Sequence, residues 1–378
     1  MVKDLDKFLS LHILLQKRRG QMFTISLCMI VKNEECIIER CLDSVQHLVD
    51  EINIIDTGST DRTKDIVRNY TSRIFDFTWC DDFAKARNFS FQQATKDFIL
   101  WLDADDVITT EHQQKFLQLK QSLFYPNVDA VSMDYYLTLD ADGCVESSEK
   151  RFRLVKRERN FQWWGAVHEY LDITGQLYHS DVAVTHLPRK SDIHRNINIY
   201  ERLKKEGHPF SARETFRYAN ELKIHQRYLE AINHYNIFLD STKGTDDENI
   251  QACLNLADCY QQLHDAKQAT QAILQSLLYD RPRPETCCRI GHFFMEQMKN
   301  KEAIYWYSQA LQQPIEQTMA VHKHAYSTWL PHLQLSLLYN RLRLFENAYQ
   351  HNEVARKFKP KDQRILDNRK HLLSQLKK

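Results

Sequence analysis

The chain has 378 residues, with 51 lysines and arginines against 50 aspartates and glutamates, and only 8 glycines. A net charge of +1 excludes a nucleic-acid binder that relies on bulk attraction to phosphate, and 43% hydrophobic residues exclude a disordered chain. Because turns use glycine heavily, its shortage predicts that most of the chain is helical.

The N-terminal segment, residues 1–22, contains an apolar run at 8–15 that is preceded by acidic residues and followed by the basic residues 17–19. This pattern is a poor signal peptide and fits a short amphipathic helix. No other stretch approaches the ~20 apolar residues that a membrane span requires, so we expect a cytoplasmic protein without a span. Nine cysteines without regular spacing predict buried thiols rather than a disulfide framework or a zinc site.

The next part of the chain alternates short apolar runs, suited to buried strands, with helical patterns, and we assign residues 23–208 to one domain. This alternation predicts a Rossmann-like α/β domain with a mostly parallel sheet and with ligands bound at the carboxyl ends of its strands. The predicted strands are residues 25–31, 51–56, 73–78 and 98–102.

The remaining part, residues 209–378, carries a long-period repeat. Alanines recur as anchors at positions 231, 269, 303 and 348, and a small residue precedes each anchor by twelve positions. Small residues at helix crossings every ~34 residues are typical of tetratricopeptide repeats, so we predict an all-α repeat domain whose concave surface binds peptides. The third interval is too long, which predicts an insertion around 312–329. The small residues are Ala219, Ala257, Gly291 and Ser336.

An acidic pair, Asp103 and Asp105, directly follows the apolar run at 98–102. One of them can hold Mg²⁺ or Mn²⁺ while the other reaches a ribose hydroxyl. Alone, such a pair also occurs in solvated acidic loops, so its meaning depends on the surrounding motifs.

Four motifs in order resemble the family 2 glycosyltransferases, which have a GT-A fold. They are SLCMIVKNEE at 26–35, IIDTGSTD at 54–61, ARN at 86–88 and LWLDADD at 100–106. The resemblance implies that Asp56 and the end of the first strand hold the nucleotide, that Arg87 lies near it, that Asp103 contacts the ribose or the metal, and that Asp105 binds the metal. The residues implied at the strand end are Val31, Asn33 and Glu34.

A later segment, WWGAVHE at 163–169, resembles the acceptor side of the same family. An inverting transfer needs a base for the acceptor proton, and we assign Glu169 to that role, with His168 second or as a structural histidine. Trp164 is assigned to the nucleotide-sugar site, where an indole can stack on a sugar. His186 resembles the late histidine that completes the metal site together with Asp105 and Asp103.

The combination of a GT-A domain with tetratricopeptide repeats resembles the peptide S-glycosyltransferases of glycocin biosynthesis, the sublancin and thurandacin type. The resemblance implies an inverting enzyme that uses Mg²⁺ or Mn²⁺ and moves a hexose, glucose for this type, from a UDP-sugar to a cysteine or serine of a precursor peptide. It also implies a homodimer and a peptide held by the repeat domain. Arg151 and Arg153 either neutralise the diphosphate or are surface charges.

Two other functions fit parts of the sequence. A saccharide-directed family 2 enzyme, of the lipopolysaccharide-core type, would share the catalytic motifs but would give the repeats no obvious role. A non-catalytic repeat scaffold would not need the intact acidic pair or Glu169. Sequence therefore favours peptide glycosylation.

Overall fold

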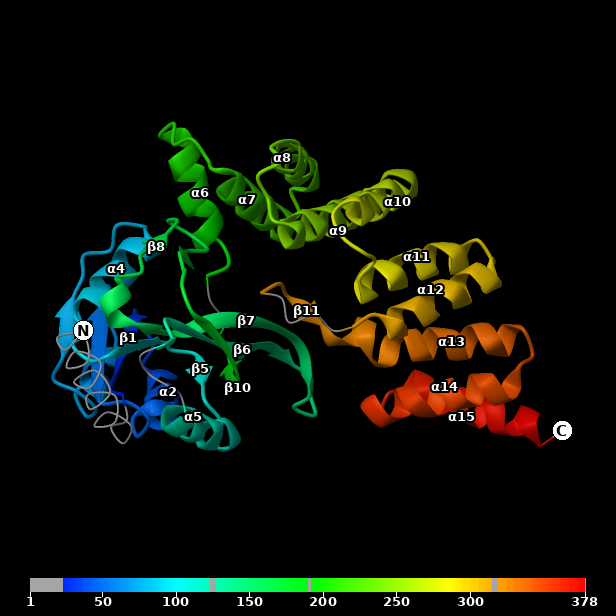
Figure 1. Cartoon of the computed structure of the whole chain (residues 1–378). Coiled ribbons are helices and arrows are strands. Elements are labelled where there is room, and N and C mark those ends of the chain that lie inside the picture. Colours follow the sequence, from blue (N-terminus) through cyan, green and yellow to red (C-terminus); the bar gives the residue numbers. More distant parts are fainter. Residues whose placement is uncertain (1–22, 123–126, 190–191, 315–318, 378) are drawn as a thin grey trace, which may run out of the picture. The chain divides into compact units, whose positions relative to one another are not determined.

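The structure is a computed structural model that describes residues 23–122, 127–189, 192–314 and 319–377 (Figure 1). The chain forms two compact units. The sheet unit comprises Met1–Tyr135 and Arg151–Ser191, and the helical unit comprises Tyr136–Lys150 and Asp192–Lys378. The amphipathic helix predicted within residues 1–22 lies outside the described residues.

The sheet unit is built on a mixed sheet with the strand order β3-β2-β1-β4-β7-β6-β10-β5. Strands β3, β2, β1 and β4 run parallel, whereas β7 pairs antiparallel with β4, and β10 pairs antiparallel with β5. The predicted α/β class is therefore confirmed. The strands are β1 Ile25–Val31, β2 Glu51–Asp56, β3 Ile74–Asp76, β4 Phe98–Trp101, β5 Asp106–Val107, β6 Ala130–Leu139, β7 Val145–Lys156 and β10 Leu177–His186.

The remaining elements of the sheet unit are short. Helix α2 packs with its apolar side inward, and Ile38, Cys41, Leu42 and Val45 are fully buried. Strand β1 is buried along almost its whole length, as expected for a strand covered on both faces. The helices are α2 Ile38–Val45, α3 Thr63–Val67, α4 Phe83–Gln92 and α5 Thr110–Ser122, and a small two-stranded sheet consists of β8 Trp163–Trp164 and β9 Tyr170–Leu171.

The parallel strands bring the predicted site positions to one edge of the sheet. Val31 lies opposite Asp56 in the register of β1 and β2, and Cys28 lies opposite Trp101 in that of β1 and β4. Because Val31, Asp56 and Trp101 are the last residues of their strands, the loops that follow all leave from this carboxyl edge.

The opposite end of β2 carries Glu51, whose side chain is 7% exposed and lies in a dense polar network. Its Oε1 accepts hydrogen bonds from Ser26 Oγ (2.7 Å), Asn53 Nδ2 (2.8 Å) and Thr95 N (3.0 Å), and its Oε2 accepts one from Thr95 Oγ1 (2.5 Å). Burial alone would raise the pKa of Glu51, but the bonds from Thr95, Asn53 and Ser26 outweigh it and lower this pKa to about 2. The ionised carboxylate thus fastens the amino-terminal edge of the sheet.

We expect Glu51→Gln to lower the free energy of unfolding at pH 7 by about 2–3 kcal/mol, since each tenfold change in acidity is worth about 1.4 kcal/mol. The folded pKa lies below the unfolded value of about 4.3, so this stabilisation is present above that pH and is lost as the pH falls towards 2. Urea unfolding followed by tryptophan fluorescence should therefore show the gap between variant and wild type narrowing from pH 7 to pH 3. A difference in the free energy of unfolding that stays constant from pH 7 to pH 3 would contradict this. The control is Glu39→Gln, a change at an exposed glutamate.

The helical unit is a series of helix pairs, α7 with α8, α9 with α10, α11 with α12 and α13 with α14, followed by α15 (Figure 1). All four anchor alanines are buried, and so are the small residues twelve positions before them, as predicted for crossings in tetratricopeptide-like repeats. The helices are α6 Arg195–Lys205, α7 Ala212–Ile224, α8 Tyr228–Asp240, α9 Asp246–Gln262, α10 Ala266–Gln275, α11 Pro284–Glu296, α12 Asn300–Gln312, α13 Trp329–Arg341, α14 Phe345–Phe358 and α15 Gln363–Leu376.

The third crossing is closer than alanine would allow without adjustment. A Cβ atom added to Gly291 would lie 3.1 Å from ring carbons of Tyr307. The predicted insertion is also present between α12 and α13, where it forms the strand β11, His322–Lys323, and a 3-10 turn at His324–Ser327. Strand β11 pairs antiparallel with Ser147 and Ser148, residues of β7 that belong, like β11, to the helical unit.

No helix in the described part of the chain combines the length and the apolar character needed to cross a bilayer.

Candidate functional site

Three acidic residues, Asp103, Asp105 and Asp106, lie on a tight turn that follows β4, the acidic turn. The amide of Asp106 donates to the carbonyl of Asp103 (3.1 Å), and Oδ2 of Asp106 accepts from the amide of Asp103 (2.9 Å). The segment is thus a tight turn. The carboxylates of Asp103 and Asp105 point apart, because Asp103 faces Arg87 while Asp105 faces His186.

Arg87, on α4, joins two carboxylates that are far apart in the sequence. Its Nη2 donates to Asp103 Oδ1 (2.7 Å), and its Nε donates to Glu169 Oε1 (2.5 Å). The guanidinium lies 4.8 Å from the ring centroid of Trp101 and 4.9 Å from that of Trp163. A nearly buried, doubly paired arginine between two indoles holds a fixed orientation, so it sets the relative position of Asp103 and Glu169.

The electrostatics of this pairing favour the charged forms. Burial opposes ionisation of Asp103, yet Arg87 and Arg153 hold the pKa of that carboxyl well below its usual value. Burial likewise opposes the charge on Arg87, but Asp103 and Glu169 raise its pKa further. Asp103 is therefore a carboxylate at any physiological pH.

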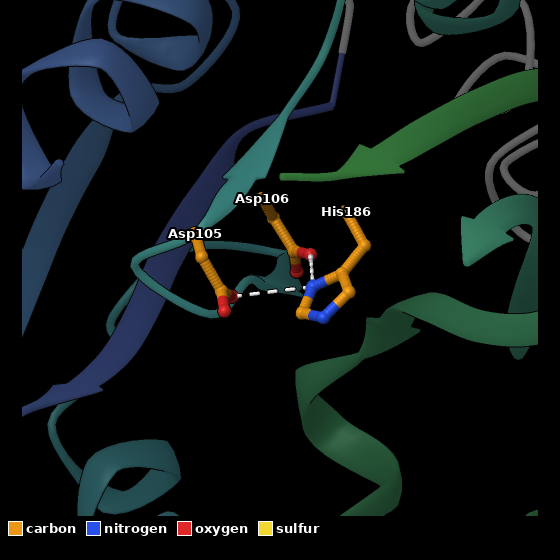
Figure 2. Close-up of side chains that lie close together, drawn as sticks. All are labelled: Asp105, Asp106 and His186. Atoms are coloured by element: carbon orange, nitrogen blue, oxygen red, sulfur yellow. Dashed lines mark ion pairs between the residues drawn. The ribbon is translucent and has the colours of Figure 1, made fainter. Parts of the chain in front are cut away.

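Next to the group formed by Arg87, Asp103 and Glu169 there is a second cluster of side chains. It comprises Asp105, Asp106 and His186, as Figure 2 shows. The antiparallel register of β5 and β10 places His186 directly opposite Asp106. Nδ1 of His186 is 3.4 Å from Oδ1 of Asp105 and 3.8 Å from Oδ1 of Asp106. Burial lowers the pKa of His186, but the two carboxylates outweigh it and raise this pKa to about 9. Positive charge is thus strongly favoured between these side chains.

Asp56, the last residue of β2, presents one free oxygen at the carboxyl edge. Its Oδ1 accepts from the amides of Gly58 and Ser59, both at 2.9 Å. Its Oδ2 is buried and has no hydrogen-bond partner among the described residues. Leaving a buried acceptor unpaired costs about 1–3 kcal/mol, so this oxygen marks a place for an N–H or O–H group of a ligand.

The residues at the end of β1 shape the loop that follows Asp56. Val31, Asn33 and Glu34 each hydrogen-bond to that loop, and Asn33 takes up a left-handed backbone conformation (φ 56°) to do so. They therefore form the wall next to Asp56. The bonds run from Thr57 N to Val31 O (2.9 Å), from Asn33 N to Ser59 Oγ (3.0 Å), from Thr60 N to Asn33 Oδ1 (2.8 Å) and from Glu34 N to Thr63 Oγ1 (2.7 Å).

The predicted acceptor segment is attached to α4 by two neighbouring residues. Asn88 clamps the backbone of Trp163, accepting from its amide (2.8 Å) and donating to its carbonyl (3.0 Å), while Arg87 binds Glu169. Trp163 is buried, but Trp164 is 55% exposed, so only Trp164 has a face available for stacking. His168 adopts φ 53°, a left-handed turn immediately before Glu169.

Residues 26–138 match the sequence profile of the family described as Glycosyl transferase family 2. The chain carries a family 2 glycosyltransferase domain. The matched range covers β1 through β6 and includes Asp56, Arg87 and the acidic turn, whereas Glu169 and His186 lie beyond it. The glycosyltransferase assignment made from the motifs is thus confirmed.

Among curated proteins, a TPR repeat-containing protein of Synechococcus elongatus is 28% identical over 334 residues, covering 85% of this chain and 75% of that protein. The SPbeta prophage-derived glycosyltransferase SunS of Bacillus subtilis is 26% identical over 259 residues, covering 65% of this chain and 60% of SunS. An uncharacterized glycosyltransferase of Rickettsia typhi is 24% identical over 225 residues, which cover 53% of this chain and 74% of the Rickettsia protein. These relatives agree with a family 2 domain joined to tetratricopeptide-like repeats.

The three predicted metal ligands, Asp103, Asp105 and His186, do not all lie together in the structure. Asp105 and His186 meet as predicted, but their third neighbour is Asp106, while Asp103 pairs with Arg87. Asp106 was overlooked although it is the third acid of the DADD run. Asn88 was also overlooked, and its only signal was its place beside Arg87 in the ARN motif.

Proposed function

We propose that the chain is an inverting, metal-dependent glycosyltransferase that moves a hexose, glucose in the first instance, from a UDP-sugar to a cysteine or serine of a peptide. The observation that carries the proposal is the carboxyl edge of the sheet. There, Arg87 fixes Glu169 beside Asp103, next to the cluster of Asp105, Asp106 and His186. A candidate base, Glu169, and a candidate cation site thus lie near each other at this edge, with Asp103 between them in the chain of contacts.

The donor is held, in this proposal, by the wall at the end of β1 and by two carboxylates. Oδ2 of Asp56 accepts the imide N–H of uracil, which would satisfy its unpaired state. Asp103 accepts a ribose hydroxyl with the carboxylate oxygen that faces away from Arg87. Val31, Asn33 and Glu34 line the base, and Trp164 offers its exposed indole to the sugar.

The second cluster fits a divalent cation by its donor chemistry. Its ligand atoms lie within 4.8 Å of one another, and ligands at about 2.1–2.2 Å from one ion are about 3–4 Å apart. Asp106 Oδ1 and His186 Nδ1 are buried and make no hydrogen bond among the described residues, and they face each other at 3.8 Å, where a shared ion would satisfy both. Two carboxylates and an imidazole suit Mn²⁺, and suit Mg²⁺ less well because of the nitrogen.

The acceptor step uses the chain's own base. Glu169 takes the proton of the peptide thiol or hydroxyl while sulfur or oxygen attacks C1 of the sugar. The bond between C1 and the diphosphate oxygen breaks, and UDP leaves with that electron pair, so the configuration at C1 inverts. A divalent cation, when bound, supplies positive charge for the departing diphosphate.

The peptide acceptor follows from the second part of the chain. A series of tetratricopeptide-like helix pairs offers an extended surface for a polypeptide, and a saccharide acceptor would not need one. We therefore assign residues 23–208 to catalysis and residues 209–378 to peptide binding. A homodimer, which the glycocin-type resemblance implies, is part of the proposal and is tested by sedimentation equilibrium.

The test is incubation of the full chain with UDP- and GDP-sugars, Mn²⁺ or Mg²⁺, and cysteine-containing peptides, followed by mass spectrometry. We expect a hexose-sized mass increase on a peptide with a UDP-sugar, and its disappearance when the cysteine is replaced by alanine. Transfer to a saccharide but to no peptide would support the lipopolysaccharide-core alternative. A donor that stays intact with every acceptor would contradict the enzymatic proposal.

Removal of divalent cations is expected to abolish transfer, because the departing diphosphate would lose its counter-charge. Dialysis against EDTA followed by the same assay tests this. We expect Mn²⁺ to restore more activity than Mg²⁺, since one of the three ligands is an imidazole. Full activity after dialysis would contradict the metal dependence.

A further inference from the structure

Arg153, on β7, is a fully buried arginine directly beneath the acidic turn. Its guanidinium lies 3.9 Å from the ring centroid of Trp101 and 4.5 Å from that of Tyr135, so it is enclosed by two aromatic rings. Its Nη1 donates to the carbonyl of Trp101 (3.3 Å). With no exposed surface, it is neither the surface charge nor the diphosphate contact that the sequence suggested.

The ion pair of Arg153 is with Asp106. Nη2 of Arg153 lies 3.0 Å from Oδ2 of Asp106, whereas the nearest contact to Asp103 is 3.9 Å, from Nη1 to Oδ2. Both partners of the first pair are completely buried. Burying a charge pair is costly unless its geometry is well fixed, and the surrounding rings and the Trp101 carbonyl provide that fixation.

The two oxygens of Asp106 consequently have different surroundings. Oδ2 is occupied by Arg153 and by the amide of Asp103 (2.9 Å). Oδ1 is buried and makes no hydrogen bond within the described part of the chain, and its ion-pair contact is with Nδ1 of His186 at 3.8 Å, drawn as a dashed line in Figure 2. A fully buried carboxylate that has one oxygen beside Arg153 and the other facing the imidazole of His186 can bind a cation together with that imidazole.

We infer that Asp106, and not Asp103, completes the cation site with Asp105 and His186, and that Arg153 is the positioning residue that holds Asp106 as a ligand. This inference rests on the proposed metal-dependent function and names the residues of that site. Partners that orient a ligating carboxylate commonly contribute 10–100-fold in metal affinity. Asp103, held by Arg87, is then left for the donor.

The test is a titration of the full chain with Mn²⁺ alone, followed by electron paramagnetic resonance. We expect Asp106→Asn to weaken Mn²⁺ binding by about 10–100-fold and Arg153→Lys, which keeps the charge but loses the planar guanidinium held between Trp101 and Tyr135, to weaken it by about tenfold or more. The matched control Asp103→Asn should weaken binding far less than Asp106→Asn, because its carboxylate faces Arg87 and is not among the ligand atoms of the cluster. Nitrogen couplings to bound Mn²⁺ should disappear in His186→Gln.

The opposite pattern overturns the inference. If Asp103→Asn weakens Mn²⁺ binding and Asp106→Asn does not, the cation lies on the Arg87 side of the turn. Absence of Mn²⁺ binding by the wild-type chain overturns it as well. Asp106→Asn preserves the shape of the side chain, so it decides the question even if Arg153→Lys fails to fold by circular dichroism. Because the titration needs no sugar donor, its outcome is separate from that of the transfer assay.

Discussion

Replacing Glu169 by glutamine is expected to reduce sugar transfer to a cysteine-containing peptide by about 10²–10⁴-fold, the usual contribution of a general base. The glutamine oxygen can still accept from Nε of Arg87, so the ion pair becomes a hydrogen bond and the segment from Trp163 onward keeps its place. What is lost is the ability to take the acceptor proton. The transfer rate at saturating donor, measured by mass spectrometry, reports this loss.

The matched control is His168→Asn, at the neighbouring position. Asparagine tolerates the left-handed backbone of His168 (φ 53°), so the turn that directs Glu169 inward is preserved. We expect this variant to keep transfer within about fivefold, far less than the loss of a general base. The donor affinity of both variants should match that of the wild type. If His168→Asn abolishes transfer while Glu169→Gln retains it, His168 is the base and Glu169 is not.

The parallel half of the sheet was predictable because its signals are local. Strand β4 reads as an uninterrupted apolar run, β1 is apolar apart from Ser26, and β2 carries a short run of isoleucines around Asn53; all three are buried along almost their whole length. Parallel strands that end together then place Asp56 and the acidic turn at one edge without any further information. The buried alanines of the repeats were predictable for a similar reason, because a helix crossing excludes larger side chains at a fixed period.

The antiparallel half was not predictable from local patterns. Strand β7 reads VESSEKRFRLVK, a mixture of charged and apolar residues, and it is completely buried only over its last four positions. The pairing of β5 with β10, which sets His186 opposite Asp106, joins residues 80 positions apart. Arg153 shows why this matters, since an arginine in such a strand looks like a surface charge until the strand is placed.

Loss of the positive charge at Arg87 is expected to have the second large effect. Arg87→Met would remove the ion-pair partner of Glu169 and leave Asp103 with only the more distant Arg153, and removing one partner of a buried pair costs about 3–5 kcal/mol. We expect a lower urea midpoint and transfer at least about 10³-fold below the wild type, because the base and the donor carboxylate lose their common support. Both quantities are measured on the same preparation.

The variant Arg87→Lys distinguishes the effect of the positive charge at this position from the effect of the two N–H groups that bind Asp103 and Glu169. A lysine keeps the positive charge, but its single ammonium cannot present two separate N–H groups from the space between Trp101 and Trp163. We therefore expect a near-normal urea midpoint with transfer reduced by about 10²-fold. The matched control is Arg68→Lys on the same unit, where an exposed arginine pairs with Asp65 and the change should be neutral. If Arg87→Lys transfers sugar as fast as this control, charge alone suffices, and Arg87 does not act by fixing Glu169 relative to Asp103.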